Sequence, residues 1–351
     1  MEWIKYIVLP FFIALISTPI VMKVAKYIDA YAKINARTIH TSKTIARIGG
    51  VAIYVAFIIS MTCFMKSDTQ IRGILLGSSV MFFGGLIDDL VDLSPKKKFA
   101  FQVVASLIVI FYGNIMLDKI FLPFGIEINM GLVSYIVTFF WLTGITNAIN
   151  LIDGLDGLAR GISLIILVVI ASLSVIDNRP DIMHISLILV GALAAFLLFN
   201  FYPAKIFLGD CGALFLGFMI ATISLIGFKS STFITLGLPI LMCGVPIIDT
   251  LSAILRRKLS GKKIDEADKN HLHHVLMRRF GHKNTVLILY AVTLCSGIVA
   301  YIYILNKKIG LTLLFVELIV GEIFLEKTQM IAPWFHPITS IVNLIKNTKK
   351  D

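Results

Sequence analysis

Residues 73–93 read GILLGSSVMFFGGLIDDLVDL, an apolar run that ends in three aspartates. The run is close to the roughly 20 residues that a helix needs to cross a bilayer. Ionised carboxylates are costly next to hydrocarbon, so acids retained there point to a function. The stretch therefore predicts a membrane helix that carries Asp88, Asp89 and Asp92 at one end.

The rest of the chain has the composition of a membrane protein. Of its 351 residues, 58% are hydrophobic and only 15% are charged, whereas soluble globular domains carry about 25% charged residues. About eleven apolar segments predict an all-α polytopic membrane protein. These segments are 3–25, 48–65, 73–91, 99–117, 131–149, 160–176, 183–200, 212–228, 232–255, 284–305 and 309–327. We expect one transmembrane domain over residues 1–327 and a cytoplasmic tail over 328–351.

The distribution of basic residues predicts the orientation. Alternate connections hold most of the Lys and Arg residues, and basic connections face the cytoplasm. This places the N-terminus outside and the C-terminus inside. The acidic and histidine-rich stretches then all fall on the cytoplasmic side, which predicts an active site at that face. The same basic connections explain the net charge of +11, so we expect no nucleic-acid partner.

The first polar stretch, DDLVD, groups three carboxylates at the end of its helix. Asp88 and Asp92 share a face, and Asp89 lies about 100° away. Carboxylates this close require a divalent cation or basic partners nearby. Lys98 follows shortly after and is placed to meet a phosphate at the membrane interface. A solvated helix end, capped by LSPKKK (93–98), is the alternative interpretation.

The stretch NAINLIDGLDGLARG (147–161) carries a polar side chain at every third position, at Asn147, Asn150, Asp153 and Asp156. Its glycines allow a ligand to approach the backbone. Amide and carboxylate oxygens suit Mg²⁺, or the ribose and base edges of a nucleotide. A helix turn without a ligand is the alternative.

Two further aspartates lie in apolar surroundings. Asp210, in FLGDCGALFLG (207–217), is placed either to cap a helix or to bind a metal from a flexible loop. Asp249 lies seven residues before Arg256, two turns along the same face. We expect Asp249 to pair with a basic residue at the inner interface.

A histidine-rich stretch, HLHHVLMRRFGH (271–282), contributes His271, His273 and His274 beside Arg278 and Arg279. No carboxylate or cysteine completes a zinc pattern such as HExxH. Histidines and arginines on one basic loop better suit a nucleotide-sugar diphosphate. A solvated loop is the alternative.

Five of these stretches resemble, in order and spacing, the motifs of the polyprenyl-phosphate N-acetylhexosamine-1-phosphate transferases. They are GGLIDDLVDLSPKKKF (84–99), NAINLIDGLDGLA (147–159), FLGDCGALFLGF (207–218), PIIDTLSAILRR (246–257) and ADKNHLHHVLMRRFGH (267–282). The resemblance spans roughly residues 37–283. The histidine stretch looks like the branch that initiates teichoic acid, O-antigen or enterobacterial common antigen synthesis.

The resemblance implies a reaction, its location and its partners. Undecaprenyl phosphate and a UDP-N-acetylhexosamine, with UDP-GlcNAc as the expected donor, would give undecaprenyl-diphosphate-HexNAc and UMP. The cofactor would be Mg²⁺, with Mn²⁺ as a substitute. The family also implies a multi-pass protein of the bacterial plasma membrane that forms a homodimer.

The resemblance further implies roles for individual residues. The implied catalytic residues are Asp88, Asp89, Asp153 and His273. The implied metal ligands are Asn150 and Asp210. The implied nucleotide-sugar site comprises Asp153, Gly154, Asp156, His271, His273, His274 and Arg278. The implied lipid-phosphate site comprises Lys98, Arg37 and His40.

The first cytoplasmic loop departs from the family pattern DxPNxRKxH…PxPRxGG. Arg47 and the two glycines after it match, but the family aspartate falls at Ala32, and Asp29 is displaced by three residues. Three alternatives stay open: a phospho-MurNAc-pentapeptide transferase, a membrane transporter, and a catalytically silent scaffold. A transporter would place acids near the membrane midplane, whereas these motifs lie toward one face.

Overall fold

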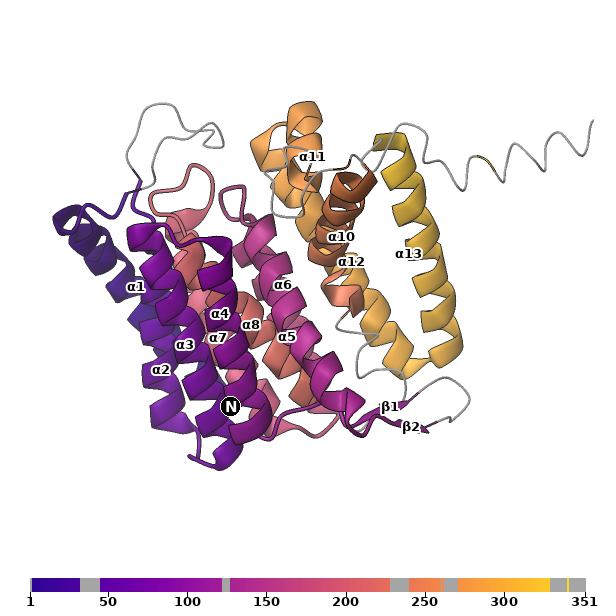
Figure 1. Cartoon of the computed structure of the whole chain (residues 1–351), viewed down its shortest axis with the longest axis horizontal. Coiled ribbons are helices and arrows are strands. Elements are labelled where there is room, and N and C mark those ends of the chain that lie inside the picture. Colours follow the sequence, from indigo (N-terminus) through magenta and orange to yellow (C-terminus); the bar gives the residue numbers. More distant parts are fainter. Residues whose placement is uncertain are drawn as a thin grey trace, which may run out of the picture.

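The computed structural model describes residues 2–31, 45–121, 127–227, 240–259, 261, 271–328 and 340, and it is almost entirely helical. The elements run in chain order as η1 (Glu2–Ile4), α1 (Lys5–Tyr27), α2 (Gly50–Phe64), α3 (Thr69–Val91), α4 (Pro95–Leu107), η2 (Ile108–Tyr112), β1 (Lys119–Phe121), β2 (Glu127–Asn129), α5 (Val133–Ile152), α6 (Leu158–Ile176), α7 (Pro180–Asn200), α8 (Gly209–Gly227), α10 (Gly244–Leu259), α11 (Leu272–Phe280), α12 (His282–Leu305) and α13 (Lys307–Thr328). Figure 1 shows α1 to α8 as one bundle, with α10 to α13 along one edge of it.

Helix α8 is the centre of the bundle. It packs against α2, α3, α5, α6 and α7. Of the 18 residues Gly209–Ile226 in this helix, 89% are buried. In the most apolar 18-residue stretch of α1, at the periphery, only 22% are buried. An apolar helix that is buried all round belongs to the core, so the residues at the ends of α8 are held firmly in place.

The prediction of an all-α polytopic membrane protein is confirmed. Within the described part of the chain, seven helices are long and apolar enough to cross a membrane. They are α1 together with η1, α3, α5, α6, α7, α8 and α12. The other four predicted segments overlap α2, α4 continued by η2, α10 and α13, which are shorter or carry more charge. The part of segment 232–255 that precedes residue 240 lies outside the described residues. A total of eleven crossings stays a prediction.

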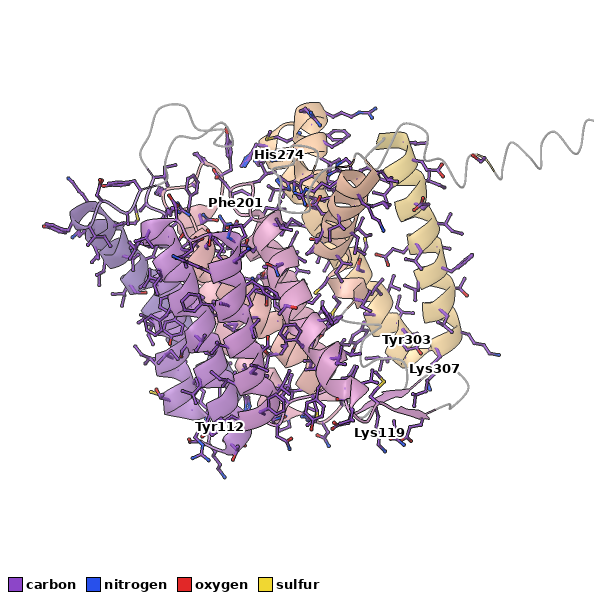
Figure 2. The ribbon with its side chains drawn as sticks, in the orientation of Figure 1. Tyr112, Lys119, Phe201, His274, Tyr303 and Lys307 are labelled. Carbon is purple, nitrogen blue, oxygen red and sulfur yellow. The ribbon has the colours of Figure 1, made fainter. Side chains whose placement is uncertain are left out.

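The strand pair and the polar motifs lie at opposite ends of the bundle. Strands β1 and β2 pair antiparallel, with Lys119 opposite Asn129, and we call this pair the hairpin. Figure 2 places Tyr112, Lys119, Tyr303 and Lys307 at this end of the molecule, and Phe201 and His274 at the other. The ends of α3 and α5 and the starts of α4 and α8 therefore lie together at the end opposite the hairpin.

Candidate active site

Four carboxylates and two basic side chains meet at the end opposite the hairpin. We call Asp88, Asp89, Asp92 and Asp210, with Arg47 and Lys98, the carboxylate cluster. Its members come from α3 and the residue that follows it, from α4 and α8, and from the segment before α2. The three aspartates of DDLVD and Asp210 are therefore brought together across more than a hundred residues of sequence.

Asp89 caps helix α8. Its Oδ1 accepts a hydrogen bond from Asp210 N at 2.9 Å, and its Oδ2 accepts one from Cys211 N at 2.9 Å. These amides are in the first turn of α8, where backbone donors have no partner within the helix. Negative charge is favourable at this position. The side chain of Asp89 is fully buried, so this carboxylate holds α8 against α3.

A glycine makes this junction possible. Gly209 has a φ of +75°, and a Cβ added there would lie 1.9 Å from Arg47 O and 2.5 Å from Asp89 Oδ2. Only glycine accommodates both the left-handed backbone and the close approach.

Arg47 binds three carboxylates of the cluster. Its Nε donates to Asp89 Oδ1 at 3.0 Å, and its two terminal nitrogens donate to Asp92 at 3.1 Å and to Asp210 at 3.3 Å. Burial lowers the pKa of Arg47, but the carboxylates of Asp89 and Asp210 outweigh it, so the pKa of Arg47 is raised. The guanidinium therefore stays charged, and it links the first loop to α3 and α8.

The backbone around Arg47 is fixed by the segment that precedes α8. Phe207 N donates to Ala46 O at 2.8 Å, and Gly49 N donates back to Phe207 O at 3.0 Å. A Cβ at position 49 would lie 2.4 Å from Phe207 O. Gly49 is therefore required for this pairing, which holds Arg47 in the cluster.

Asp88 has different partners from Asp89. It forms an ion pair with Lys98, and its Oδ1 accepts from Leu93 N at 2.7 Å. Lys98 also lies 3.5 Å from Asp210 Oδ2. Burial lowers the pKa of Lys98, but the carboxylates of Asp210 and Asp88 outweigh it and raise that pKa. A single ammonium group thus bridges two carboxylates that belong to different helices.

The two predicted metal ligands contact each other. Asn150 Nδ2 donates to Asp210 Oδ1 at 2.6 Å. Asn147 does not join them, because it exchanges two hydrogen bonds with Gln102, at 2.9 and 2.8 Å. Among the residues that the structure describes, no three His, Cys, Asp or Glu side chains converge as metal ligands. Lys98 lies where the carboxylates of Asp88 and Asp210 approach each other.

The chemistry of these groups nevertheless fits a hard divalent cation. Carboxylate and amide oxygens are the ligands that Mg²⁺ prefers. The cluster contains four carboxylates and two basic groups, so its formal charge is minus two when all six are ionised. One divalent cation would neutralise that charge.

The residues of 153–157, which we call the nucleotide turn, join α5 to α6. Asp153 forms an ion pair with Arg160. Asp156 is 3% exposed, and its Oδ2 accepts from Ala204 N at 3.0 Å. The carboxylate of Asp156 therefore anchors the 201–206 loop, whereas that of Asp153 is partly exposed, at 14%.

Helix α11, which with His271 at its N-cap we call the histidine helix, lies against the nucleotide turn. A Cβ at Gly154 would lie 2.2 Å from His273 Nε2, so the imidazole ring contacts the backbone of residue 154. The ring centroids of His273 and His274 are 4.3 Å apart. The structure thus brings the histidines and the glycine-rich stretch together, as the implied nucleotide-sugar site requires.

Asp249 positions the histidine helix. Its Oδ1 accepts from Leu272 N at 2.6 Å, and its Oδ2 lies 3.0 Å from His271 Nδ1 and 3.8 Å from His273 Nδ1. Asp249 does pair with a basic side chain as expected, and that side chain is His271. A buried carboxylate that orients an imidazole is a common arrangement around functional histidines.

The environment of His274 keeps it neutral. Burial, together with the neighbouring His273 and His271, lowers the pKa of His274 to about 4. Arg278, exposed in the last turn of α11, also acts to lower it. A site with this charge distribution is prepared for an anion, because an incoming phosphate would relieve the repulsion among these groups.

Several site residues had no role in the sequence-based prediction. Arg47 matched a family position but was given no role, and Arg160 and Asn200 were not considered. The signal for Arg160 was available, because a basic residue directly follows the polar stripe of NAINLIDGLDGLARG. Two predicted lipid-phosphate residues, Arg37 and His40, lie outside the described residues.

Residues 71–228 match glycosyl transferase family 4. The chain is 38% identical to a probable undecaprenyl-phosphate N-acetylglucosaminyl 1-phosphate transferase of Bacillus subtilis, over 93% of this chain and 92% of that protein. It is 32% identical to a decaprenyl-phosphate N-acetylglucosaminephosphotransferase of Mycobacterium leprae, over 81% and 79%. It is 31% identical to a phospho-N-acetylmuramoyl-pentapeptide-transferase of Listeria monocytogenes, over 72% and 82%. With these motifs, this geometry and these relatives, the chain belongs to the polyprenyl-phosphate N-acetylhexosamine-1-phosphate transferases.

Proposed function

We propose that the protein transfers N-acetylglucosamine 1-phosphate from UDP-GlcNAc to undecaprenyl phosphate, giving undecaprenyl-diphosphate-GlcNAc and UMP. The observation that carries the proposal is the bridge of Lys98 between Asp88 and Asp210, which joins the lipid-phosphate and metal positions implied by the family. The relatives from Bacillus and Mycobacterium, which are named as N-acetylglucosamine phosphotransferases, support GlcNAc as the donor sugar.

The reaction forms one phosphorus–oxygen bond and breaks another. An oxygen of the lipid phosphate attacks the phosphorus that carries the sugar, and the bond from that phosphorus to the oxygen shared with UMP breaks. UMP leaves with the electron pair of that bond. Since such transfers have little covalent chemistry for a protein to supply, positioning and charge neutralisation are the main requirements.

The cluster meets these requirements with groups from different helices. Lys98 and Arg47 would neutralise phosphate charge, and Asp88 would take a proton from the lipid phosphate. We assign the base to Asp88 rather than Asp89, because both oxygens of Asp89 accept from backbone amides of α8, whereas Oδ2 of Asp88 faces the side chain of Lys98. Asp210 and Asn150 would hold Mg²⁺, or Mn²⁺ in its place, which would supply further neutralisation of the diphosphate.

The nucleotide turn and the histidine helix would hold the UDP-sugar. Asp153, with one carboxylate oxygen not used by Arg160, would accept hydrogen bonds from the nucleoside. His273 and His274 would face the diphosphate and the sugar, and Arg278 would add positive charge. The contact of His273 with Gly154 supports this division, because it joins the two halves of the proposed site.

We also propose the orientation and setting of the protein. The N-terminus lies outside and the C-terminus in the cytoplasm, with about eleven crossings of the bacterial plasma membrane. The separation of His274 and Phe201 from Lys119 and Lys307 (Figure 2) supports a site on one side. The protein acts as a homodimer and initiates a cell-envelope glycopolymer such as teichoic acid or O-antigen.

The test is UMP release by the purified protein in detergent. Undecaprenyl phosphate and Mg²⁺ are supplied with UDP-GlcNAc, UDP-GalNAc or UDP-MurNAc-pentapeptide in separate reactions. We expect release with UDP-GlcNAc that depends on both lipid and metal. Release only with UDP-MurNAc-pentapeptide would instead favour a phospho-MurNAc-pentapeptide transferase, the activity for which the Listeria relative is named. Silence of folded protein with all three donors would contradict the proposal.

Two variants test the assigned groups. Asp210→Asn removes the carboxylate shared by Lys98, Arg47 and Asn150, and we expect it to abolish metal-dependent turnover. Activity that persists at the same magnesium concentration would remove Asp210 from the metal site. His273→Ala should raise the KM for the nucleotide sugar, and unchanged kinetics would exclude the histidine helix from the site.

A further inference from the structure

Arg160 is the most unusual side chain near the proposed site. It lies in the first turn of α6, is only 2% exposed, and is among the largest fully buried side chains of the chain. A cation at the N-terminus of a helix opposes the helix dipole, and burial of an unpaired charge is costly. Its retention therefore depends on the groups that surround it.

Those groups belong to two segments that the proposed site needs. Arg160 forms an ion pair with Asp153, and its Nε donates to Asn200 Oδ1 at 2.5 Å. The same Asn200 oxygen accepts from Gly157 N at 3.0 Å, and its Nδ2 donates to Ile206 O at 2.5 Å. Arg160 thus ties the nucleotide turn to the segment that leads into α8.

The ion pair leaves part of Asp153 available. Oδ1 is taken by Arg160, whereas Oδ2 has no hydrogen-bond partner among the described residues. With its side chain 14% exposed, Asp153 presents one fixed acceptor at the surface of the turn. Its rotation is restricted by a guanidinium that is itself fixed by Asn200.

We infer that Arg160 is a positioning residue for the nucleoside. It holds Asp153 so that the free oxygen accepts a hydrogen bond from a donor of uridine, either the uracil N–H or a ribose hydroxyl. This inference rests on the proposed function, in which the nucleotide turn binds a UDP-sugar. Fixing a group before the ligand arrives lowers the ordering cost of binding, and its loss weakens binding by about tenfold.

The test compares nucleotide binding with lipid use. Titration calorimetry with UDP alone requires no turnover, and we expect Arg160→Met to raise the Kd by about tenfold. In the transfer assay, the KM for UDP-GlcNAc should rise by a similar factor while the KM for undecaprenyl phosphate stays unchanged. Arg160→Lys should recover part of the affinity, because an ammonium can pair with Asp153 without also binding Asn200.

Control variants separate positioning from general stability. Arg179→Met removes an arginine near the opposite end of the bundle, where a terminal nitrogen of Arg179 lies 3.3 Å from Asp181 Oδ2. The UDP affinity of this variant should equal that of the wild type. Asp153→Asn keeps Arg160 bonded to Asn200 and should weaken UDP binding as much as Arg160→Met does. The double variant should be no weaker than either single variant.

The outcomes distinguish this inference from the proposed function. If the wild type transfers GlcNAc 1-phosphate but Arg160→Met binds UDP normally, only the inference is overturned. Equal increases of both KM values, with a lowered unfolding temperature, would show a purely structural role and also overturn it. A wild type that binds no UDP and transfers no sugar would instead overturn the proposed function.

Discussion

Replacement of Asp88 and of Asp89 by asparagine should affect different properties of the protein, although the two are neighbours in the sequence. Asp89 is fully buried and accepts from Arg47 Nε, Asp210 N and Cys211 N. An asparagine can keep one of its two acceptor positions, but its amide group would face a donor at the other. The variant therefore loses charge-assisted hydrogen bonds and leaves a buried donor without a partner.

The expected magnitude follows from these contacts. Breaking a buried ion pair by removing one partner costs about 3 to 5 kcal/mol. Arg47 is 21% exposed and keeps Asp92 and Asp210 as partners, so the lower end applies, and Asp89→Asn should lower the free energy of unfolding by about 3 kcal/mol. Asp88 is as deeply buried as Asp89, but Asp88→Asn can keep the hydrogen bond from Leu93 N through its remaining oxygen and leaves Lys98 paired with Asp210. We therefore expect a smaller cost, of about 1 kcal/mol.

Thermal unfolding and UMP release, measured on the same detergent preparations, separate the two effects. Asp89→Asn should unfold at a clearly lower temperature, whereas Asp88→Asn should unfold close to the wild type and release no UMP. Asp92→Asn is the matched control, because Asp92 binds the same arginine but is 50% exposed, and it should change the unfolding temperature least. Equal stability of the Asp88 and Asp89 variants would refute the division between a capping and a reacting carboxylate.

Three further changes test the histidine helix. Gly154→Ala places a Cβ 2.2 Å from His273 Nε2 and should lower turnover at least about tenfold. Gly144→Ala is the control, because a Cβ there has no neighbouring atom within 4 Å, and its turnover should be unchanged. Equal turnover of the two variants would contradict the contact between His273 and Gly154. Asp249→Asn should weaken UDP-sugar use and lower the unfolding temperature, because the carboxylate binds both an imidazole and the first amide of α11; wild-type values of both would exclude that role. The pKa of His274, about 4, lies below the unfolded value of about 6.5, so its contribution to stability is complete above pH 6.5 and is lost as the pH falls toward 4. Unfolding temperatures between pH 4 and pH 7.5 should therefore fall less steeply for His274→Gln, and parallel curves would refute this.

Much of the fold could be predicted from apolar runs and their spacing. The helices α3, α5, α6, α7, α8 and α12 coincide with predicted segments, because a run of about 20 apolar residues has few alternatives to a membrane helix. The count of crossings was harder to predict. Helix α2 has only 15 residues, and α13 carries Glu317, Glu322 and Glu326, so hydropathy alone does not settle how they sit in the membrane.

The sequence predicted which residues belong to the candidate site better than it predicted which of them contact one another. Spacing grouped Asp88 with Asp89, but sequence cannot show that one turns toward α8 and the other toward Lys98, since that depends on how helices far apart in the chain pack. The network of Arg160 and Asn200 was missed for the same reason, because its members lie 40 residues apart and meet only where α6 packs on α7. The sequence indicated Asp249 but not its partner His271, because their contact depends on how α10 packs beside the histidine helix.

The position of the carboxylate cluster at one end of the bundle bears on how the product travels. Donor, acceptor, UMP and the new lipid diphosphate are all handled at the same membrane surface. Nothing in the reaction itself moves the sugar through hydrocarbon, where a diphosphate head group would lose its hydration. Each turnover therefore leaves the lipid-linked sugar in the leaflet where it was made. A polymer that is completed outside the cell would then require a separate protein to turn this intermediate over.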